Sequence, residues 1–136
     1  MENEDAVQKI ICETARFVKK FEEIMNKTHK FSEKARQQGL LALEDFLDEE
    51  KANRKDVFVL GIRLIVDGTE TAVVDKILSN LVNLETDVDE KLLKTIQKEA
   101  VLGIQKRINF RLLSLILHSY VDSGMEDTIN CYWGTS

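Results

Sequence analysis

None of the 136 residues is proline. Because proline interrupts helices by removing a backbone donor, its absence leaves long helices permitted along the whole chain. Long apolar stretches are also missing: no run exceeds four residues, as at 57–60, whereas a membrane-spanning helix needs about 20. The acidic N-terminus, MENEDAV, lacks the basic and apolar regions of a secretory signal. We therefore expect no membrane span and a cytoplasmic location.

Cysteine is scarce, and neither sign of charge dominates. Cys12 and Cys131 stand near opposite ends of the chain, and no histidine lies within four residues of either. Without a secretory signal, this pattern indicates reduced thiols and argues against a zinc site. The 19 basic and 24 acidic side chains give a net charge of −5, which argues against sequence-independent binding to nucleic acid.

No segment carries a catalytic signature. The chain has no glycine-rich phosphate loop and no nucleophile motif. His118 and Asp122, four residues apart, are interpreted as a pair on a helix surface, and His29 is interpreted as a solvated side chain. The acidic clusters at residues 49–50 and 87–90 lack the spacing of a calcium loop. We therefore expect a non-enzymatic protein without a cofactor.

A long first helix is predicted over residues 4–37, with Asn3 as its N-cap. Apolar side chains recur at helical spacing on one face of this segment, and most charged side chains fall on the other face. This face suits a core or a partner helix, so one interpretation is a homodimer through the first helix. The face comprises Val7, Ile10, Ile11, Phe17, Val18, Phe21, Ile24, Met25 and Phe31.

Gly39 predicts a break or kink after the first helix, and residues 40–52 then resume a helical pattern. Residues 56–66 are apolar at almost every position, a pattern shared by buried strands and buried helices. No second strand-like run is present to pair with them, and an unpaired strand would leave its backbone groups without hydrogen bonds. The helix is therefore the favoured interpretation.

Gly68 predicts a left-handed turn, after which Thr69 or Thr71 would cap a helix over residues 72–83. At helical spacing, this helix is expected to bury five apolar side chains. These are Val73, Val74, Ile77, Leu78 and Leu81.

Asp87 and Glu90 resemble a capping box that opens the last long segment. A single helix over residues 88–120 would be about 50 Å long, so we expect a bend near Gly103 or Asn109, or an elongated molecule. The sequence thus predicts an all-α protein of five or six helices, with long N-terminal and C-terminal amphipathic helices. Residues 1–136 are expected to form a single compact or elongated domain.

Residues 91–111 hold six basic side chains and one acidic one, and the apolar LLSLIL stretch follows directly. Residues 91–117 therefore have the pattern of a basic amphipathic helix. Such a helix is either a solvated outer face over a core or a surface for an anionic membrane or an acidic partner. The basic residues are Lys91, Lys94, Lys98, Lys106, Arg107 and Arg111.

Two strings within residues 31–82, FSEKARQQGLLALEDFLDEE and LGIRLIVDGTETAVVDKIL, resemble the cytoplasmic region of the flagellar stator protein MotA. The resemblance implies a helix over residues 56–66. The MotA cytoplasmic region touches the rotor switch protein FliG through an arginine and a glutamate eight residues later, and Arg36 and Glu44 occupy these positions here. On one continuous helix, these two charges would lie on adjoining flanks and could steer a charged partner with little desolvation.

The chain also departs from the MotA pattern. It has no proline and none of the four membrane spans, so we expect that it cannot conduct ions or generate torque alone. The resemblance ends near residue 84, and residues 85–136 form a divergent helical part. The strings GIRLIVDGTE and LILHSYVDSGME suggest a degenerate repeat.

The resemblance implies a non-enzymatic interaction module that contacts a rotor or stator component at the cytoplasmic face of the flagellar motor. The alternative is an adaptor or peripheral membrane protein that uses the basic helix at 91–117 and is unrelated to motility.

Overall fold

A computed structural model describes residues 2–49 and 56–121 of the chain. These residues form six α-helices and one 3-10 helix without a strand among them, which confirms the expected all-α fold. None of these helices, in the ranges described, has the length and apolar character needed to cross a membrane. The helices are α1 (Glu2–Gln38), α2 (Glu44–Glu49), α3 (Val57–Val66), α4 (Thr71–Leu84), α5 (Val88–Gln105) and α6 (Phe110–His118), with the 3-10 helix η1 (Leu40–Leu43) between α1 and α2.

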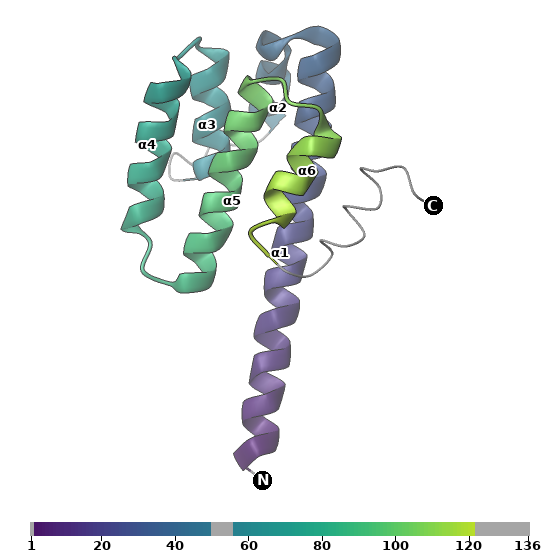
Figure 1. The fold of residues 1–136 in the computed structure, drawn as a ribbon, viewed down its shortest axis with the longest axis vertical. Helices are drawn as coiled ribbons and strands as arrows, with labels where there is room; N and C mark the ends of the chain where they lie inside the picture. Colours follow the sequence, from purple (N-terminus) through teal and green to yellow (C-terminus); the bar gives the residue numbers. More distant parts are fainter. Residues whose placement is uncertain (1, 50–55, 122–136) are drawn as a thin grey trace.

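Helix α5 is central to the bundle and contacts α1, α3, α4 and α6. Figure 1 shows α3, α4 and α5 side by side, with α1 and α6 beyond α5. With 37 residues, α1 is about 55 Å long at 1.5 Å per residue. Its N-terminal half extends past the other described helices (Figure 1). The fold therefore combines a compact bundle with one projecting helix.

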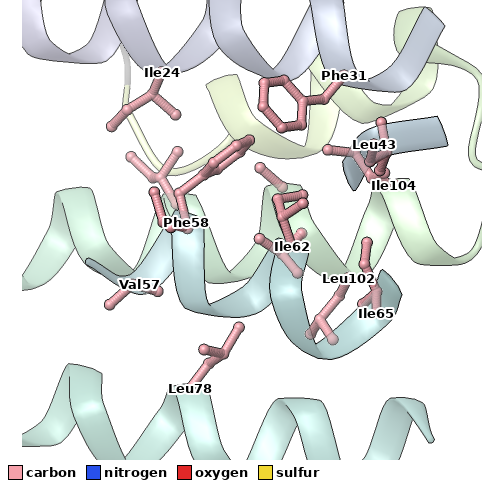
Figure 2. Packing of buried hydrophobic residues seen from close by; sticks show 14 of the residues in the cluster. Ile24, Phe31, Leu43, Val57, Phe58, Ile62, Ile65, Leu78, Leu102 and Ile104 are labelled. Carbon is pink, nitrogen blue, oxygen red and sulfur yellow. The ribbon is translucent and has the colours of Figure 1, made fainter. Parts of the chain in front are cut away.

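The core is continuous across the bundle and centres on α3 (Figure 2). Phe58 and Ile62 of α3 are almost completely buried, as is Leu78 of α4. Helix α3 lies very close to α5, because a Cβ at Gly61 would stand only 2.7 Å from the side chain of Val101. This close approach explains why a glycine occupies the middle of an apolar helix.

The helix interpretation of the apolar segment at 56–66 is confirmed. Asp56 caps α3 by accepting a hydrogen bond from the backbone N–H of Val59 at 3.1 Å. A helix satisfies its own backbone groups, so α3 can lie in an apolar core without a strand partner.

Both predicted glycine turns are present. Gly39 has φ +88° and Gly68 has φ +81°, in the left-handed region that side chains disfavour. The backbone N–H of Gly39 donates to the carbonyl of Ala35 at 2.8 Å, which closes the end of α1. The chain then reverses into η1, so the predicted break after the first helix is confirmed.

Two predicted N-caps are wrong. Helix α1 begins at Glu2, so Asn3 lies inside its first turn. The cap position of α4 is Glu70, whose side chain makes no capping hydrogen bond, and not Thr69 or Thr71. Thr69 instead completes the preceding turn, because its N–H donates to the Leu64 carbonyl at 3.0 Å.

Helix α4 buries a narrower stripe than expected. Val74 and Leu78 are fully buried, and Val82 joins them one turn later. Val73, which was expected in the core, is 45% exposed, and Ile77 and Leu81 are half-buried. Helix α4 lies at the edge of the bundle and, among the described helices, packs mainly on α3 and α5, so its flanking side chains stay near solvent.

The predicted bend in the last segment lies at residues 106–109, between α5 and α6. Arg107 has φ +56° there, and the Asn109 side chain caps α6 by accepting from the N–H of Arg111 at 2.8 Å. At the start of α5, Asp87 accepts from the N–H of Glu90 at 2.9 Å, as expected. The capping box is incomplete, because the Glu90 carboxylate pairs with Lys20 of α1 at 2.6 Å.

Some expectations fall on residues outside the described ranges. These are the end of the predicted helix at 50–52, the partner Asp122 of His118, Cys131, and the final residues of the second repeat string at 115–126. They stay predictions. Cys12 lies within the described part of α1 and is an exposed free thiol.

Candidate functional site

The corner between α1 and α2, residues 36–45, holds both sequence-predicted site residues. Arg36 lies in the last turn of α1, and Glu44 is the first residue of α2. Both are exposed. The expected relation on one continuous helix is wrong, because Gly39 ends α1 and the 3-10 helix η1 stands between the two charges. The two charges therefore lie on separate elements that meet at this corner.

The charged side chains of the corner are only weakly engaged by the protein. The guanidinium of Arg36 stands 3.7 Å from the carboxylate of Glu33, one turn earlier, and 46% of the Arg36 side chain is exposed. Within the described residues, Glu44 has neither an ion-pair partner nor a side-chain hydrogen bond. Exposed pairs of this kind contribute little stability, so both charges can exchange partners at small cost.

Aromatic and cationic contacts nevertheless hold α2 onto α1 at this corner. The rings of Phe31 and Phe46 lie 4.6 Å apart, and the ammonium groups of Lys30 and Lys34 stand 4.4 and 4.9 Å from the Phe46 ring centroid. Lys34 also pairs with Asp45 of α2 at 3.3 Å. These contacts fix the position of the exposed charges.

Leu41 is a component of the corner that the sequence reasoning missed. It lies in η1 and is 72% exposed, while Leu43 in the same short helix is completely buried. A 3-10 helix has three residues per turn, so Leu40 and Leu43 share one side and Leu41 faces away. The LLAL string after a turn-forming glycine was the available signal, because Leu40 and Leu43 share a side in an α-helix as in a 3-10 helix, and Leu41 then lies on another side.

The basic segment at 91–111 is partly neutralised within the bundle. Lys94 donates to the Glu85 carboxylate at 2.7 Å, and this hydrogen bond lowers the pKa of Glu85 below its usual value. Lys98 stands 3.4 Å from the Asp75 carboxylate of α4 and 3.6 Å from Glu99. Two of the six basic side chains therefore serve the α4–α5 contact.

The other basic side chains include a cluster at the α5–α6 connection. Lys106, Arg107 and Arg111 are exposed, and on the neighbouring helix α6 Leu112 and Ile116 are 41% and 38% exposed. These five residues form the α6 surface. It is what remains of the expected amphipathic helix at 91–117, which the bend divides between α5 and α6.

Both histidines contact rings across the α1–α6 boundary. His29 is exposed, as expected, and its ring stacks on Phe110 with centroids 4.4 Å apart. The ring of His118 meets Phe21 edge-on at 5.1 Å, and its Nδ1 lies 2.9 Å from the Ser114 carbonyl oxygen. These ring contacts contribute to the packing of α6 on α1.

Comparisons of the chain with protein-family models, with curated proteins and with solved structures find no match.

Proposed function

We propose that this protein is a non-enzymatic, cytoplasmic interaction module that binds a flagellar motor component through the α1–α2 corner. The observation that carries the proposal is the exposed group of Arg36, Leu41 and Glu44, in which the two charged residues occupy positions that resemble the rotor-contacting part of MotA. The partner is a rotor switch protein such as FliG or the cytoplasmic part of a stator.

The chemistry of the corner suits a contact that forms and breaks quickly. Leu41 supplies an apolar centre, and the opposite charges of Arg36 and Glu44 flank it, which is the usual arrangement of an interface core with a polar rim. Exposed charges contribute more to the rate and register of association than to final affinity. A partner that moves past the protein would need this behaviour.

Binding of purified FliG and of a purified stator cytoplasmic region tests the proposal, with fluorescence anisotropy as the readout. The double reversal Arg36→Glu/Glu44→Lys keeps the net charge and should slow association and weaken binding at low salt. The substitution Leu41→Ser should weaken binding by more than about fivefold if Leu41 is the anchor. Both sites are exposed, so the fold should be unchanged.

A matched control reverses Lys76 of α4 and Glu22 of α1, two exposed charges outside the corner, and should bind like wild type. If the control and the corner variant lose binding affinity equally, the losses reflect the overall charge distribution of the protein, and the assignment of the binding site to the corner would be overturned. Absence of binding to both motor proteins at low salt would overturn the proposed function.

The α6 surface supports a second candidate function, an adaptor or peripheral membrane protein unrelated to motility. Exposed apolar side chains beside Lys106, Arg107 and Arg111 are the combination that draws a helix to an anionic bilayer. The test is co-sedimentation with vesicles of phosphatidylcholine and phosphatidylserine. This candidate function predicts that the protein binds these vesicles and that binding weakens with added salt and with the double substitution Arg111→Glu/Leu112→Asp. A wild type that stays in solution when the vesicles are sedimented would exclude it.

A further inference from the structure

The N-terminal half of α1 presents an apolar seam to solvent. Val7, Ile11 and Val18 are 52%, 53% and 39% exposed, and Thr14 lies between them at the same helical spacing. Figure 1 shows this half of α1 projecting beyond the bundle. Large apolar side chains that recur on one face of an exposed helix indicate an interaction surface.

This seam continues directly into the core. The alternating steps of four and three residues that join 7, 11, 14 and 18 go on without interruption to Phe21, Met25 and Thr28, all buried. This alternation is the heptad spacing of helices that pack on one another at a small angle. The bundle therefore covers the seam from residue 21 onward, and no described residue packs over residues 7–18 in the same way.

The exposed seam is also compatible with a second copy of itself. The positions that flank it on the helix include Gln8, Ala15 and Phe17, none of which is charged. The charged residues Lys9 and Arg16 fall on the opposite side of α1. Flanking charges of one sign repel identical helices, and within residues 7–18 no charged residue flanks the seam.

We propose that α1 pairs with α1 of a second copy in an antiparallel dimer along residues 7–18. In this register Val7 faces Val18 of the partner subunit, and Ile11 faces Thr14 of the partner subunit. An antiparallel arrangement places the two bundles at opposite ends of the helix pair. A parallel arrangement would bring the bundles together, because each occupies the continuation of the seam from Phe21 onward.

A groove at the edge of the bundle extends the same surface. It has a volume of about 410 Å³, and its lining combines apolar and acidic side chains: Glu13, Thr14 and Phe17 of α1 together with Asp89, Leu92, Tyr120 and Val121. In the antiparallel register, Ile11 and Gln8 of the partner subunit lie opposite Thr14 and Phe17, the α1 residues that line this groove. Residues 7–18 span only about 17 Å along the helix, so the groove supplies contact area that a short helix pair lacks.

Sedimentation equilibrium of the full chain, under reducing conditions, tests the dimer from about 5 to about 500 µM, the range suited to a small interface. Wild type should dimerise, and Ile11→Glu should weaken the dimer at least about tenfold by placing a charge in the seam. The matched control Cys12→Glu puts the same charge on the adjacent exposed residue, off the seam, and should dimerise like wild type.

Two results would overturn the proposal: a wild type that is monomeric over the whole range, and a dimer that Ile11→Glu leaves intact. If the wild type is monomeric and Ile11→Glu lowers its melting temperature but Cys12→Glu does not, another part of the same chain covers the seam. None of these results bears on the α1–α2 corner, which lies at the other end of α1.

Spin labels at Lys19→Cys, in a background with both native cysteines replaced by serine, test the orientation. Antiparallel helices hold the two labels about 20 Å apart along the axis, whereas parallel helices hold them side by side. A measured distance below this axial separation would overturn the antiparallel register.

Discussion

The two halves of α1 share one apolar spacing but differ in what covers it. From Phe21 to Ala35 the seam is buried by the bundle, whereas Val7, Ile11 and Val18 in the first half are exposed. The difference arises from length. Helix α1 is about 55 Å long, while α5, the longest helix that packs on it, has 18 residues and spans about 27 Å. A bundle of that height cannot cover the whole of α1.

Periodicity along a helix therefore identifies the face that prefers burial but not the element that buries it. The covering element depends on the lengths and directions of helices that come much later in the chain. The same pattern thus forms a core in one half of α1 and a candidate interface in the other.

The largest expected difference between the two halves of α1 is in the unfolding free energy that is lost when an aromatic side chain of each half is replaced by alanine. Phe31 is 3% exposed and contacts the rings of Phe46 and Phe58, so Phe31→Ala should cost about 3–5 kcal/mol of unfolding free energy. Phe17 lies on the same stripe 14 residues earlier and is only half-buried, so Phe17→Ala should cost about 1 kcal/mol or less. Urea unfolding at low protein concentration measures both, and equal losses would contradict the comparison.

A smaller effect is expected where α6 closes onto α5. A Cβ at Gly103 would stand 2.3 Å from the fully buried Leu113 side chain, so Gly103→Ala should cost about 1–3 kcal/mol through overpacking. Adding Leu113→Val makes room for the new methyl group. In a double-mutant cycle, the combined loss should therefore be smaller than the sum of the single losses. Strict additivity would show that the two sites are not in contact.

The sequence could predict where this fold has helices and where two of its turns lie. Apolar periodicity is a local property, and Gly39 and Gly68 occupy positive φ values that few other residues tolerate. Other details depend on distant parts of the chain. Val73 is exposed because α4 lies at the bundle edge, and Thr69 is not a cap because its N–H completes the turn before α4. Neither fact is encoded in the neighbouring residues.

The candidate site was predictable in part. The exposure of Arg36 and Glu44 follows from their charge, and their choice came from the resemblance to MotA. Their geometry was not predictable from a helical wheel, because Gly39 separates them into two elements. Leu41 was missed because a single exposed leucine is not by itself a sign of an interface, although the spacing of Leu40 and Leu43 already places it on another side of a helix.

The boundary between the two halves of α1 is marked by the ion pair between Lys20 and Glu90 of α5. The ammonium and carboxylate are 2.6 Å apart, but each side chain is about 40% exposed, so solvent screens the attraction. A double-mutant cycle with Lys20→Met and Glu90→Gln should give a coupling below about 1 kcal/mol. A larger coupling would mean that this pair, and not apolar contact, determines where coverage of α1 begins.

The smallest expected effect is a difference in how the bundle and the projecting half of α1 respond to low pH. The hydrogen bond from Lys94 lowers the pKa of Glu85, so this pair contributes stability above the usual pKa of a glutamate, and the contribution is lost as the pH falls through the lowered value. The melting temperature of wild type should therefore decline slightly more than that of Lys94→Met as the pH is lowered below about 4.5. Val7, Ile11, Thr14 and Val18 carry no titratable side chain, so the contacts along the seam should withstand moderate acidification that stays above the unfolding transition. A dimer that dissociates in this range while the bundle stays folded would show that the acidic lining of the groove, Glu13 and Asp89, contributes more to the dimer than the apolar seam, and would contradict the apolar character assigned to this half of α1.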